Sequence, residues 1–355
     1  MAVKLEMCDL SSRTSTVQRM FDAQGRQETR WAWFETLAQT TMRGTERASI
    51  AMLTDDDGLI VAAIPLASVD HKLARGLTAP YSTLFQPPLD NSEYAIVLGR
   101  LLAPHIAGVL RLDCIDVGDP AMDGFLRGLS EGGSVLAVYA HFANWHEDIA
   151  AFPDYWTTRG SRLKSTIKRK SAALTRDHRL RFETVDLTKD WQSGADIYNA
   201  IYAKSWKPPE PHEGFIGSLL RNLGPEGTAR LALAVIDDVP AAAQIWLVRP
   251  PYATIFKLAQ DPKFDQHSPG SLLTHWFLKE LCENGGVRSV DFGRGDDAYK
   301  KDWLKHRRLR QGAIVANPRT LRGLVATILE IWPTKLSSYI HGWFAGSAAN
   351  ERGEA

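Results

Sequence analysis

The stretch LALAVIDDVPAAAQIWLV, residues 231–248, decides the fold. Two apolar runs, residues 229–237 and 241–248, flank the short turn 238–240. Apolar runs of this length joined by so short a turn are typical of an antiparallel β-hairpin. A third run, residues 252–259, follows two prolines and predicts another strand. The stretch therefore predicts the centre of a largely antiparallel sheet.

Downstream, the pattern changes from strand to helix and back. The polar loop 260–269 is followed by a predicted helix over 270–283 and a strand over 287–292. We expect the helix to open at Gly270, where the backbone can be approached closely, with Ser271 as a good cap. A helix N-terminus has unpaired N–H groups and the positive end of the helix dipole, so it suits an anion. An ordinary capped helix explains the same residues.

The run DFGRGDDAYKKDW, residues 291–303, contains a G-x-G-x-x-A pattern that occurs in dinucleotide-binding turns. Asp296 and Asp297, however, place negative charge where a pyrophosphate would lie. No acidic residue occurs between residues 304 and 329 to bind a ribose, although a dinucleotide fold needs one about 20 residues on. The run also ends a block of strands instead of opening one. We interpret its glycines as turn residues that bring Asp296, Asp297 and Tyr299 over a cleft.

The first half of the chain follows a similar plan. A helix is predicted from Trp31, and apolar runs at 49–53 and 59–66 flank an Asp-Gly turn, a strong hairpin signal. Residues 1–30 lack a regular pattern, and residues 71–90 are rich in proline and aromatic residues, which favours a loop.

A basic amphipathic helix, residues 161–177, marks a change of character, so we place a domain boundary near residue 155. The predicted domains are 1–155 and 156–320. They are followed by an apolar, tryptophan-containing tail, 321–355, which Pro333 is expected to break.

Composition bounds the classes of function. The 355 residues suit two domains, and the net charge of +1 favours no polyanion as partner. The cysteines are scattered without a C-x-x-C pair, which excludes a disulfide framework and most structural zinc sites, so no metal is expected. The N-terminus lacks the apolar core of a signal peptide, and no run approaches the ~18 apolar residues of a membrane span. We expect a cytoplasmic protein.

Four stretches together resemble the GNAT acyltransferase superfamily. They are YNAIYAKSWKPPEP (198–211), LALAVIDDVPAAAQIWLV (231–248), IFKLAQDPKFDQHSPGSLL (255–273) and VDFGRGDDAYKKDWL (290–304). More narrowly, they resemble the CelD-like (cellulose-biosynthesis type) branch, which is related to the FemABX peptidyl transferases. The resemblance covers roughly residues 155–315, and the first half is similar in layout only. It implies an α/β protein with two tandem GNAT-like domains, the first degenerate, and mixed, largely antiparallel sheets.

The resemblance also implies an acyl-CoA donor lying across a splayed sheet. Its pantetheine would pair with the strand 252–259, and its pyrophosphate would lie on the amides at the start of the following helix. The implied donor-binding residues are Lys257, Leu258, Gln266, His267, Ser268, Gly270, Ser271 and Leu272. The usual phosphate loop is Q/R-x-x-G-x-G/A, whereas this loop is one residue longer before its glycine and contains Pro269, which has no N–H. The departure leaves another acyl carrier open as the donor.

The chemistry requires few side chains. An amine that attacks a thioester needs a group to take its proton and an acid for the leaving thiolate. In GNAT enzymes the acid is often a tyrosine placed as Tyr299 is here. Asp296 and Asp297 are candidates for the base or for orienting the amine, and Lys300 could neutralise nearby charge. The alternatives are purely structural roles, in which the aspartates cap a helix and Tyr299 belongs to the core.

The implied acceptor-binding residues come from three places. Trp206, Lys207 and Glu210 lie around a rigid Pro-Pro step that looks like a pocket wall, or else a helix stop with exposed charges. Gln244 could point into the cleft from the neighbouring strand. His141 follows the strand 134–141 and could line a cleft between the domains.

The leading function is acyl-CoA-dependent N-acylation of a cell-envelope precursor. The acceptor is either a long-chain lipid base, which would give a ceramide-like amide, or an amino sugar of an exopolysaccharide. The alternatives are a FemABX-type transferase that uses aminoacyl-tRNA, and a non-catalytic GNAT scaffold in polymer assembly. Nucleic acid is otherwise not an expected partner, because the basic helix is not interleaved with aromatic residues. Peripheral association with the inner membrane is possible through the apolar tail.

Overall fold

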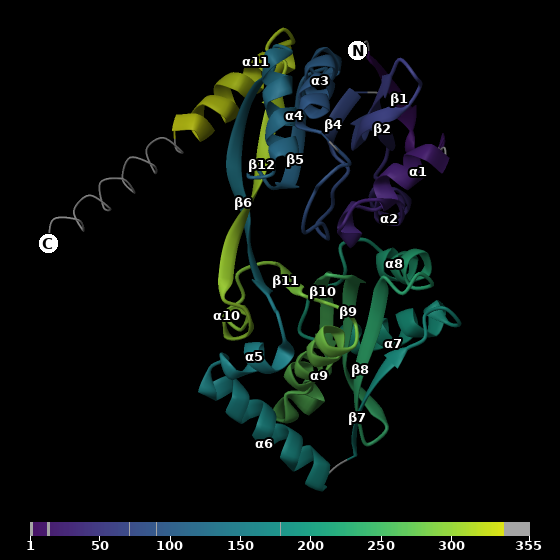
Figure 1. The fold of residues 1–355 in the computed structure, drawn as a ribbon, viewed down its shortest axis with the longest axis vertical. Coiled ribbons are helices and arrows are strands. Elements are labelled where there is room, and N and C mark those ends of the chain that lie inside the picture. The colour runs from purple at the N-terminus through teal and green to yellow at the C-terminus, as the bar shows by residue number, and fades with distance from the viewer. Residues whose placement is uncertain (1–2, 13–14, 71, 90, 178, 337–355) are drawn as a thin grey trace, which may run out of the picture. The chain divides into compact units, whose positions relative to one another are not determined.

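The computed structural model describes residues 3–12, 15–70, 72–89, 91–177 and 179–336. The chain forms two compact units (Figure 1). The first unit consists of Met1–Ala23, Met42–Phe142 and Leu309–Ala355, and the second of Gln24–Thr41 and Ala143–Arg308. The division of the sequence at residues 155 and 320 into domains with separate roles stays a prediction.

The first unit is an α/β layer built on a mixed sheet. Its strand order is β1-β2-β3-β4-β5-β12-β6. The strands are β1 Val3–Asp9, β2 Glu46–Asp55, β3 Ile60–Val69, β4 Lys72–Gly76, β5 Val109–Ile115, the first part of β6 Val135–Asp148 and most of β12 His306–Ala316. The helices include α1 Ser15–Asp22, α3 Ser92–Leu102, α4 Pro120–Glu131 and α11 Leu321–Ala326, which continues into the π-helical turn η5 Thr327–Ile331. The predicted β2–β3 hairpin is confirmed.

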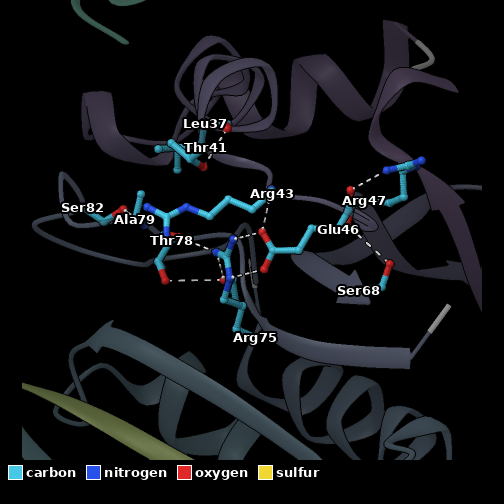
Figure 2. Close-up of polar contacts among 11 residues, drawn as sticks. Leu37, Thr41, Arg43, Glu46, Arg47, Ser68, Arg75, Thr78, Ala79 and Ser82 are labelled. Atoms are coloured by element: carbon cyan, nitrogen blue, oxygen red, sulfur yellow. Dashed lines mark hydrogen bonds and ion pairs between the residues drawn. The ribbon is translucent and has the colours of Figure 1, made fainter. Parts of the chain in front are cut away.

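A polar cluster connects the sheet of the first unit to the segment after β4. Figure 2 shows the Arg75 guanidinium against the Glu46 carboxylate, with Nη2 to Oε2 at 3.1 Å and Nε to Oε1 at 3.3 Å. Arg75 also donates to the Thr78 carbonyl. Because this two-pronged pair is half-buried, it fixes the start of β2 against the chain that leaves β4.

The second unit has the strand order β6-β11-β10-β9-β8-β7. The strands are β7 Leu180–Val185, β8 Ala229–Ile236, β9 Val239–Arg249, β10 Tyr252–Gln260, β11 Ser289–Arg294 and the last part of β6. The helices are α2 Trp31–Thr41, α5 Phe152–Thr157, α6 Ser161–Asp177, α7 Trp191–Lys204, α8 Phe215–Leu223, α9 Pro269–Glu283 and α10 Lys300–Trp303, with 3-10 turns η2 Gln27–Thr29 and η4 Pro262–His267. Among the described strand pairs of this unit, β10 and β11 are parallel and the others are antiparallel. The predicted α/β class with a mixed, largely antiparallel sheet is confirmed.

The β8–β9 hairpin forms as predicted, but its turn lies one residue earlier. Asp237 and Asp238 have φ angles of 49° and 63°, and Val239 already belongs to β9. Two-residue hairpin turns of type I′ need positive φ at both central residues, and aspartate is among the few non-glycine residues that tolerate it. The Asp-Asp pair therefore sets the register of the central sheet.

Both faces of this sheet are covered. On one face, Trp246 of β9 meets Phe277 of α9 and Phe292 of β11 in edge-to-face contacts. On the other face, Phe256 of β10 packs edge-on against Trp33 of α2. The sheet is thus a rigid, dry platform, so the polar groups at its edge and in its loops are the places where chemistry can occur.

Several sequence expectations need correction. Residues 1–30 were expected to be irregular, yet they contain β1 and α1, and the expected loop 71–90 contains β4. The basic segment 300–310 contains α10 and the start of β12. The tail does not break at Pro333, because the helical chain continues to residue 336. The preceding π turn widens the helix where the proline lacks an N–H, which explains how the proline is tolerated. Residues 337–355 of the tail lie outside the described residues.

In the part of the chain that the structure describes, we find no helix long and apolar enough to cross a membrane.

Candidate active site

The central feature of the second unit is the point where β10 and β11 separate. Their parallel register runs from Tyr252 opposite Ser289 to Thr254 opposite Asp291. A bulge between Ile255 and Lys257 then shifts β10 within its pairing with β9. The register between β10 and β11 ends at Thr254. Beyond it, the edge of residues 255–260 that faces away from β9 is not paired with β11. Such an edge can pair with an extended ligand as an added strand would.

Three predicted residues meet beside this opening. Lys257 of β10 forms an ion pair with Glu210, with Nζ 2.7 Å from Oε2 and 2.9 Å from Oε1. Lys207 donates from Nζ to the Leu258 carbonyl at 2.7 Å. Tyr202 of α7 fixes the intervening turn by donating to the Pro208 carbonyl at 2.8 Å. The Pro-Pro step therefore holds a lysine and a glutamate against the strand that was predicted to bind the donor.

The charge of Lys207 is destabilised in this position. Burial is the main cause, and the Lys257 ammonium adds to it, so that the pKa of Lys207 falls to about 8. The charges of Asp297 and Lys300 also act on this pKa, which places the loop after β11 within electrostatic reach of the cluster. Burial likewise lowers the pKa of Lys257, although Glu210 opposes the shift. Trp206, which precedes Lys207, is largely exposed.

Lys300 has a structural position. Its side chain is only 3% exposed, and Nζ lies 3.0 Å from the Asp297 carboxylate. It also donates to the carbonyls of Arg294 and Gly295. Gly295 has a φ of 100°, a conformation that side chains rarely adopt, and this lets the loop curl around the ammonium. Lys300 thus holds the loop that carries Asp297 and neutralises part of its charge.

Asp297 and Asp296 have different partners. Asp297 is largely exposed, and its carboxylate forms an ion pair with Lys300. Asp296 accepts from Arg307 Nε at 2.9 Å and from Trp145 Nε1 at 2.7 Å. The hydrogen bond from Arg307 is the main reason why the pKa of Asp296 is lowered. Of the two aspartates, Asp297 is the better placed to receive an amine.

Tyr299 stands at the start of α10. Its ring packs against Phe292 with the centroids 6.5 Å apart. Desolvation raises the pKa of the phenol, and the nearby charge of Asp297 raises it further. Tyr299 therefore stays protonated at neutral pH and can act as a hydrogen-bond donor.

A buried network that the sequence did not reveal fixes the loop after β11. Asp291 accepts from Asn144 Nδ2 at 2.6 Å, from the Gly293 amide at 2.7 Å and from Arg308 Nη2 at 2.7 Å. Arg308 also donates to Asn144 Oδ1 at 2.7 Å. Asn144 lies 147 residues from Asp291 and 164 from Arg308, so no local pattern could have paired it with them. They position the chain that leads to Asp297 and Tyr299.

The predicted phosphate site differs from the expectation. The helix α9 begins at Pro269, not at Gly270, and Ser271 is not its cap. Ser268 occupies the cap position with a φ of 54° and no side-chain cap bond. Its amide donates to Asp265, and the Gly270 amide donates to Gln260 Oε1 at 3.2 Å.

The remaining residues of this loop are also engaged. The Leu272 amide donates to Ser268, and the Gln266 carbonyl accepts from Lys170 of α6. Gln266 and His267 contact each other through their side chains at 3.2 Å. Much of the predicted phosphate cradle is therefore occupied by the chain itself, so a diphosphate would have to displace internal hydrogen bonds to bind there.

Two predicted acceptor residues lie elsewhere. Gln244 is buried and donates to the Gly270 carbonyl at 3.0 Å and to Thr274 Oγ1 at 2.8 Å, so it fastens α9 to the sheet. His141 belongs to the first unit, where its Nδ1 accepts from the Cys114 amide at 3.2 Å.

A groove of about 680 Å³ lies between α6 and α9. Its lining includes Lys164, Lys168 and Arg176 from α6, with Trp156 and Phe182 as aromatic walls. The lining residues of this groove include no carboxylate. Since Lys170 ties α6 to the loop before α9, the groove begins close to the predicted phosphate site and offers it positive charge.

β10 has an unpaired backbone edge, and the loop after β11 carries a protonated tyrosine and a carboxylate. Acyl transfer onto an amine could use these groups. The comparisons agree with this class of reaction. Residues 161–301 match the family described as acetyltransferase (GNAT) domain. Residues 161–301 are therefore similar to GNAT acetyltransferase domains, and this similarity supports the predicted acyltransferase class. The CelD-like branch stays a prediction.

Solved structures share the fold at low sequence identity. FemX is 10% identical, with 92% of this chain and 100% of that chain covered and a TM-score of 0.59. L-PGS from Bacillus licheniformis is 12% identical, with 91% and 96% covered and a TM-score of 0.51. The C-terminal domain of a protein described as a lysylphosphatidylglycerol synthetase, from Agrobacterium fabrum, is 12% identical, with 88% and 95% covered and a TM-score of 0.51. No curated protein sequence matches the chain.

Proposed function

We propose that the second unit transfers an acyl group from acyl-CoA to a primary amine of a cell-envelope precursor. The observation that carries this proposal is the open edge of β10 after Thr254, with Lys207, Glu210 and Lys257 gathered beside it. The acyl-bearing arm of the donor would pair with this edge as an extended chain, which brings the thioester toward the loop of Asp297 and Tyr299.

In the proposed mechanism the amine nitrogen attacks the thioester carbonyl carbon, the C–N bond forms and the C–S bond breaks. Asp297 orients the ammonium form of the acceptor and takes the proton that makes it nucleophilic. Tyr299 donates its phenolic proton to the leaving thiolate, which leaves as the thiol. The second proton that the nitrogen loses on forming the amide returns to the Tyr299 phenolate through solvent, and Asp297 releases its proton to solvent. Asp296 is not assigned as the base. Its ion pair with Arg307 lowers its pKa, which makes the carboxylate a weaker proton acceptor, and its oxygens already accept hydrogen bonds from Arg307 and Trp145. Lys300 holds the loop.

The acceptor is the less constrained partner. We favour the amine of a long-chain lipid base, giving a ceramide-like amide, over an amino sugar of an exopolysaccharide. One protein with this fold carries a name that refers to a lipid product, lysylphosphatidylglycerol, although an identity of 12% transfers only the fold. A lipid acceptor would also fit peripheral association of the protein with a membrane.

A second candidate donor is an aminoacyl-tRNA, as in FemABX-type transferases. The occupied amides before α9 favour it over a diphosphate, and the basic groove between α6 and α9 offers a surface for a nucleic-acid backbone. The two candidates differ in what they require. Transfer from acyl-CoA is insensitive to nuclease, whereas transfer from tRNA is abolished by it.

Hydrogen exchange tests the proposed donor site directly. On addition of saturating acyl-CoA, we expect slower exchange in the peptide that covers residues 255–260, because an added strand would satisfy the open edge. The β2–β3 hairpin of the first unit serves as the internal control and should not change. Unchanged exchange at 255–260, together with no saturable heat of binding in calorimetry, would reject acyl-CoA as the donor.

A further inference from the structure

The helix that begins with α11 exposes an unusual amount of apolar surface. Thirteen large apolar side chains are exposed in the described residues, and seven of them lie within residues 321–336. They are Leu321, Leu324, Val325, Ile328, Leu329, Trp332 and Leu336. Leu321, Leu329 and Trp332 are 81%, 68% and 61% exposed. Their spacing of three or four residues places them along one side of the helix, which we call the α11 stripe.

The opposite side of this helix is firmly packed. Ala326 and Ile331 belong to a core cluster of the first unit with Ala316 of β12. At Gly323 an added Cβ would lie 2.0 Å from the Asn317 carbonyl, so the backbone approaches too closely for any other residue. Glu330 forms an ion pair with Arg111 of β5. The helix is therefore fixed with the α11 stripe facing away from its own unit.

Positive charge flanks the α11 stripe. Arg319, Arg322 and Lys335 are exposed along the same segment. The nearby acid, Glu330, is already paired with Arg111. An apolar stripe with exposed cations and a tryptophan matches the boundary between the acyl chains and the headgroups of an anionic bilayer.

We propose that the α11 stripe docks the protein on an anionic membrane surface, with the helix lying in the plane of the interface. Over its described residues, 321–336, the helix is not long or apolar enough to cross a bilayer. A solvent-exposed apolar surface of this extent marks an interaction site, and the cations favour lipid headgroups over a second apolar protein face.

Docking through the α11 stripe goes beyond the catalytic proposal, since it depends neither on the donor nor on the acceptor. Its test is binding of the full chain to vesicles, without any activity measurement. The protein is sedimented with vesicles of phosphatidylcholine alone and of phosphatidylcholine mixed with phosphatidylglycerol. We expect binding to the mixed vesicles that weakens as salt is raised, because the headgroup contribution is screened.

The variant Leu329→Glu with Trp332→Glu should lower the partition coefficient at least about 100-fold, since each large apolar side chain removed from the interface costs roughly tenfold or more. Leu59→Glu is the matched control, because Leu59 is 57% exposed in the β2–β3 turn of the same unit. It should bind as the wild type does. All three proteins should keep the same thermal midpoint, since the changed side chains are exposed.

Three outcomes would overturn the proposal. The wild type could fail to bind mixed vesicles, or the double variant could bind as well as Leu59→Glu. A dimer that dissociates in the double variant would assign the α11 stripe to a second copy of the chain.

Discussion

At the scale of the residue, similar side chains take different roles because their surroundings differ. Asp296 is locked by Arg307 and Trp145, whereas its neighbour Asp297 remains open to an amine. Lys300 is buried under three oxygens, whereas Lys207 is bound to the edge of β10 with a pKa of about 8. The proposed mechanism therefore assigns proton transfer to Tyr299 and Asp297.

Tyr299→Phe tests the assigned acid. We expect kcat for acyl transfer to fall about 10²–10⁴-fold with little change in KM, because the ring contact with Phe292 is kept and only the proton donor is lost. The raised pKa of Tyr299 also predicts no loss of rate from its ionisation below about pH 10. Steady-state kinetics against Tyr94→Phe of the first unit measure both effects. An unchanged kcat would assign the acid to a group other than Tyr299.

Lys207 predicts a specific dependence of stability on pH. Its pKa falls from the ordinary 10.5 to about 8 on folding, so the unfolded chain binds more protons between these values. The contribution of Lys207 to the free energy of unfolding is therefore lowest below pH 8, and it rises as the pH increases toward 10.5. The free energy of unfolding of the wild type relative to Lys207→Gln should rise over this window by on the order of 2–3 kcal/mol. Denaturant titrations at several pH values measure it, and a flat or falling difference would contradict the assignment.

At the scale of the element, local signals identified hairpins and helices, and non-local partners decided the rest. The Asp-Gly turn and the short turn expected at 238–240 predicted their hairpins correctly, although the second turn lies one residue earlier than expected. The strand β12 was missed because its start, HRRLR, is highly charged. In the structure Arg308 is paired with Asp291 and Arg310 with Asp116, so distant carboxylates make a strand of this sequence possible.

The same reasoning explains the candidate site. Trp206 to Glu210 and the Asp297 loop were predicted individually, since each lies in a recognisable motif. The network of Asn144, Asp291 and Arg308 was not, because an asparagine or an arginine in a strand carries no local signal of its partner. The start of α9 was predicted one residue too late, because Gly270 and Ser271 suit the opening of a helix. Proline is itself favoured at the first helical position, which agrees with the observed start at Pro269.

The connection between α5 and α6 depends on one buried ion pair. Arg159 donates to both oxygens of Glu147 at 2.8 and 2.9 Å and to the Trp303 carbonyl, and both charged side chains are almost fully buried. Arg159→Ala leaves the Glu147 charge with only Lys305 beside it. We expect a loss of about 3–5 kcal/mol in the free energy of unfolding.

Arg162→Ala is the matched control for Arg159→Ala, because Arg162 is exposed at the start of α6. Its effect should be within about 0.5 kcal/mol. Chemical denaturation of both variants gives the comparison. Equal effects would show that the buried pair does not hold this connection.

At the scale of the whole molecule, the chain passes between the two units more than once. Residues 24–41 belong to the second unit, and the chain returns to the first unit after residue 308. The strands β6 and β12 each contribute residues to both units. Each unit is therefore built from segments that are distant in the sequence, because strand pairing between such segments determines which residues share a core.

The central claim is that this chain moves an acyl group from a CoA thioester to an amine. The most direct measurement is the release of free thiol from a long-chain acyl-CoA by the purified full chain, with and without a long-chain amine and with nuclease present. We predict saturable thiol release that requires the amine, forms an equal amount of amide and is lost in Asp297→Asn. No amine-dependent thiol release, or amide formation only when aminoacyl-tRNA is supplied and nuclease is omitted, would contradict the claim.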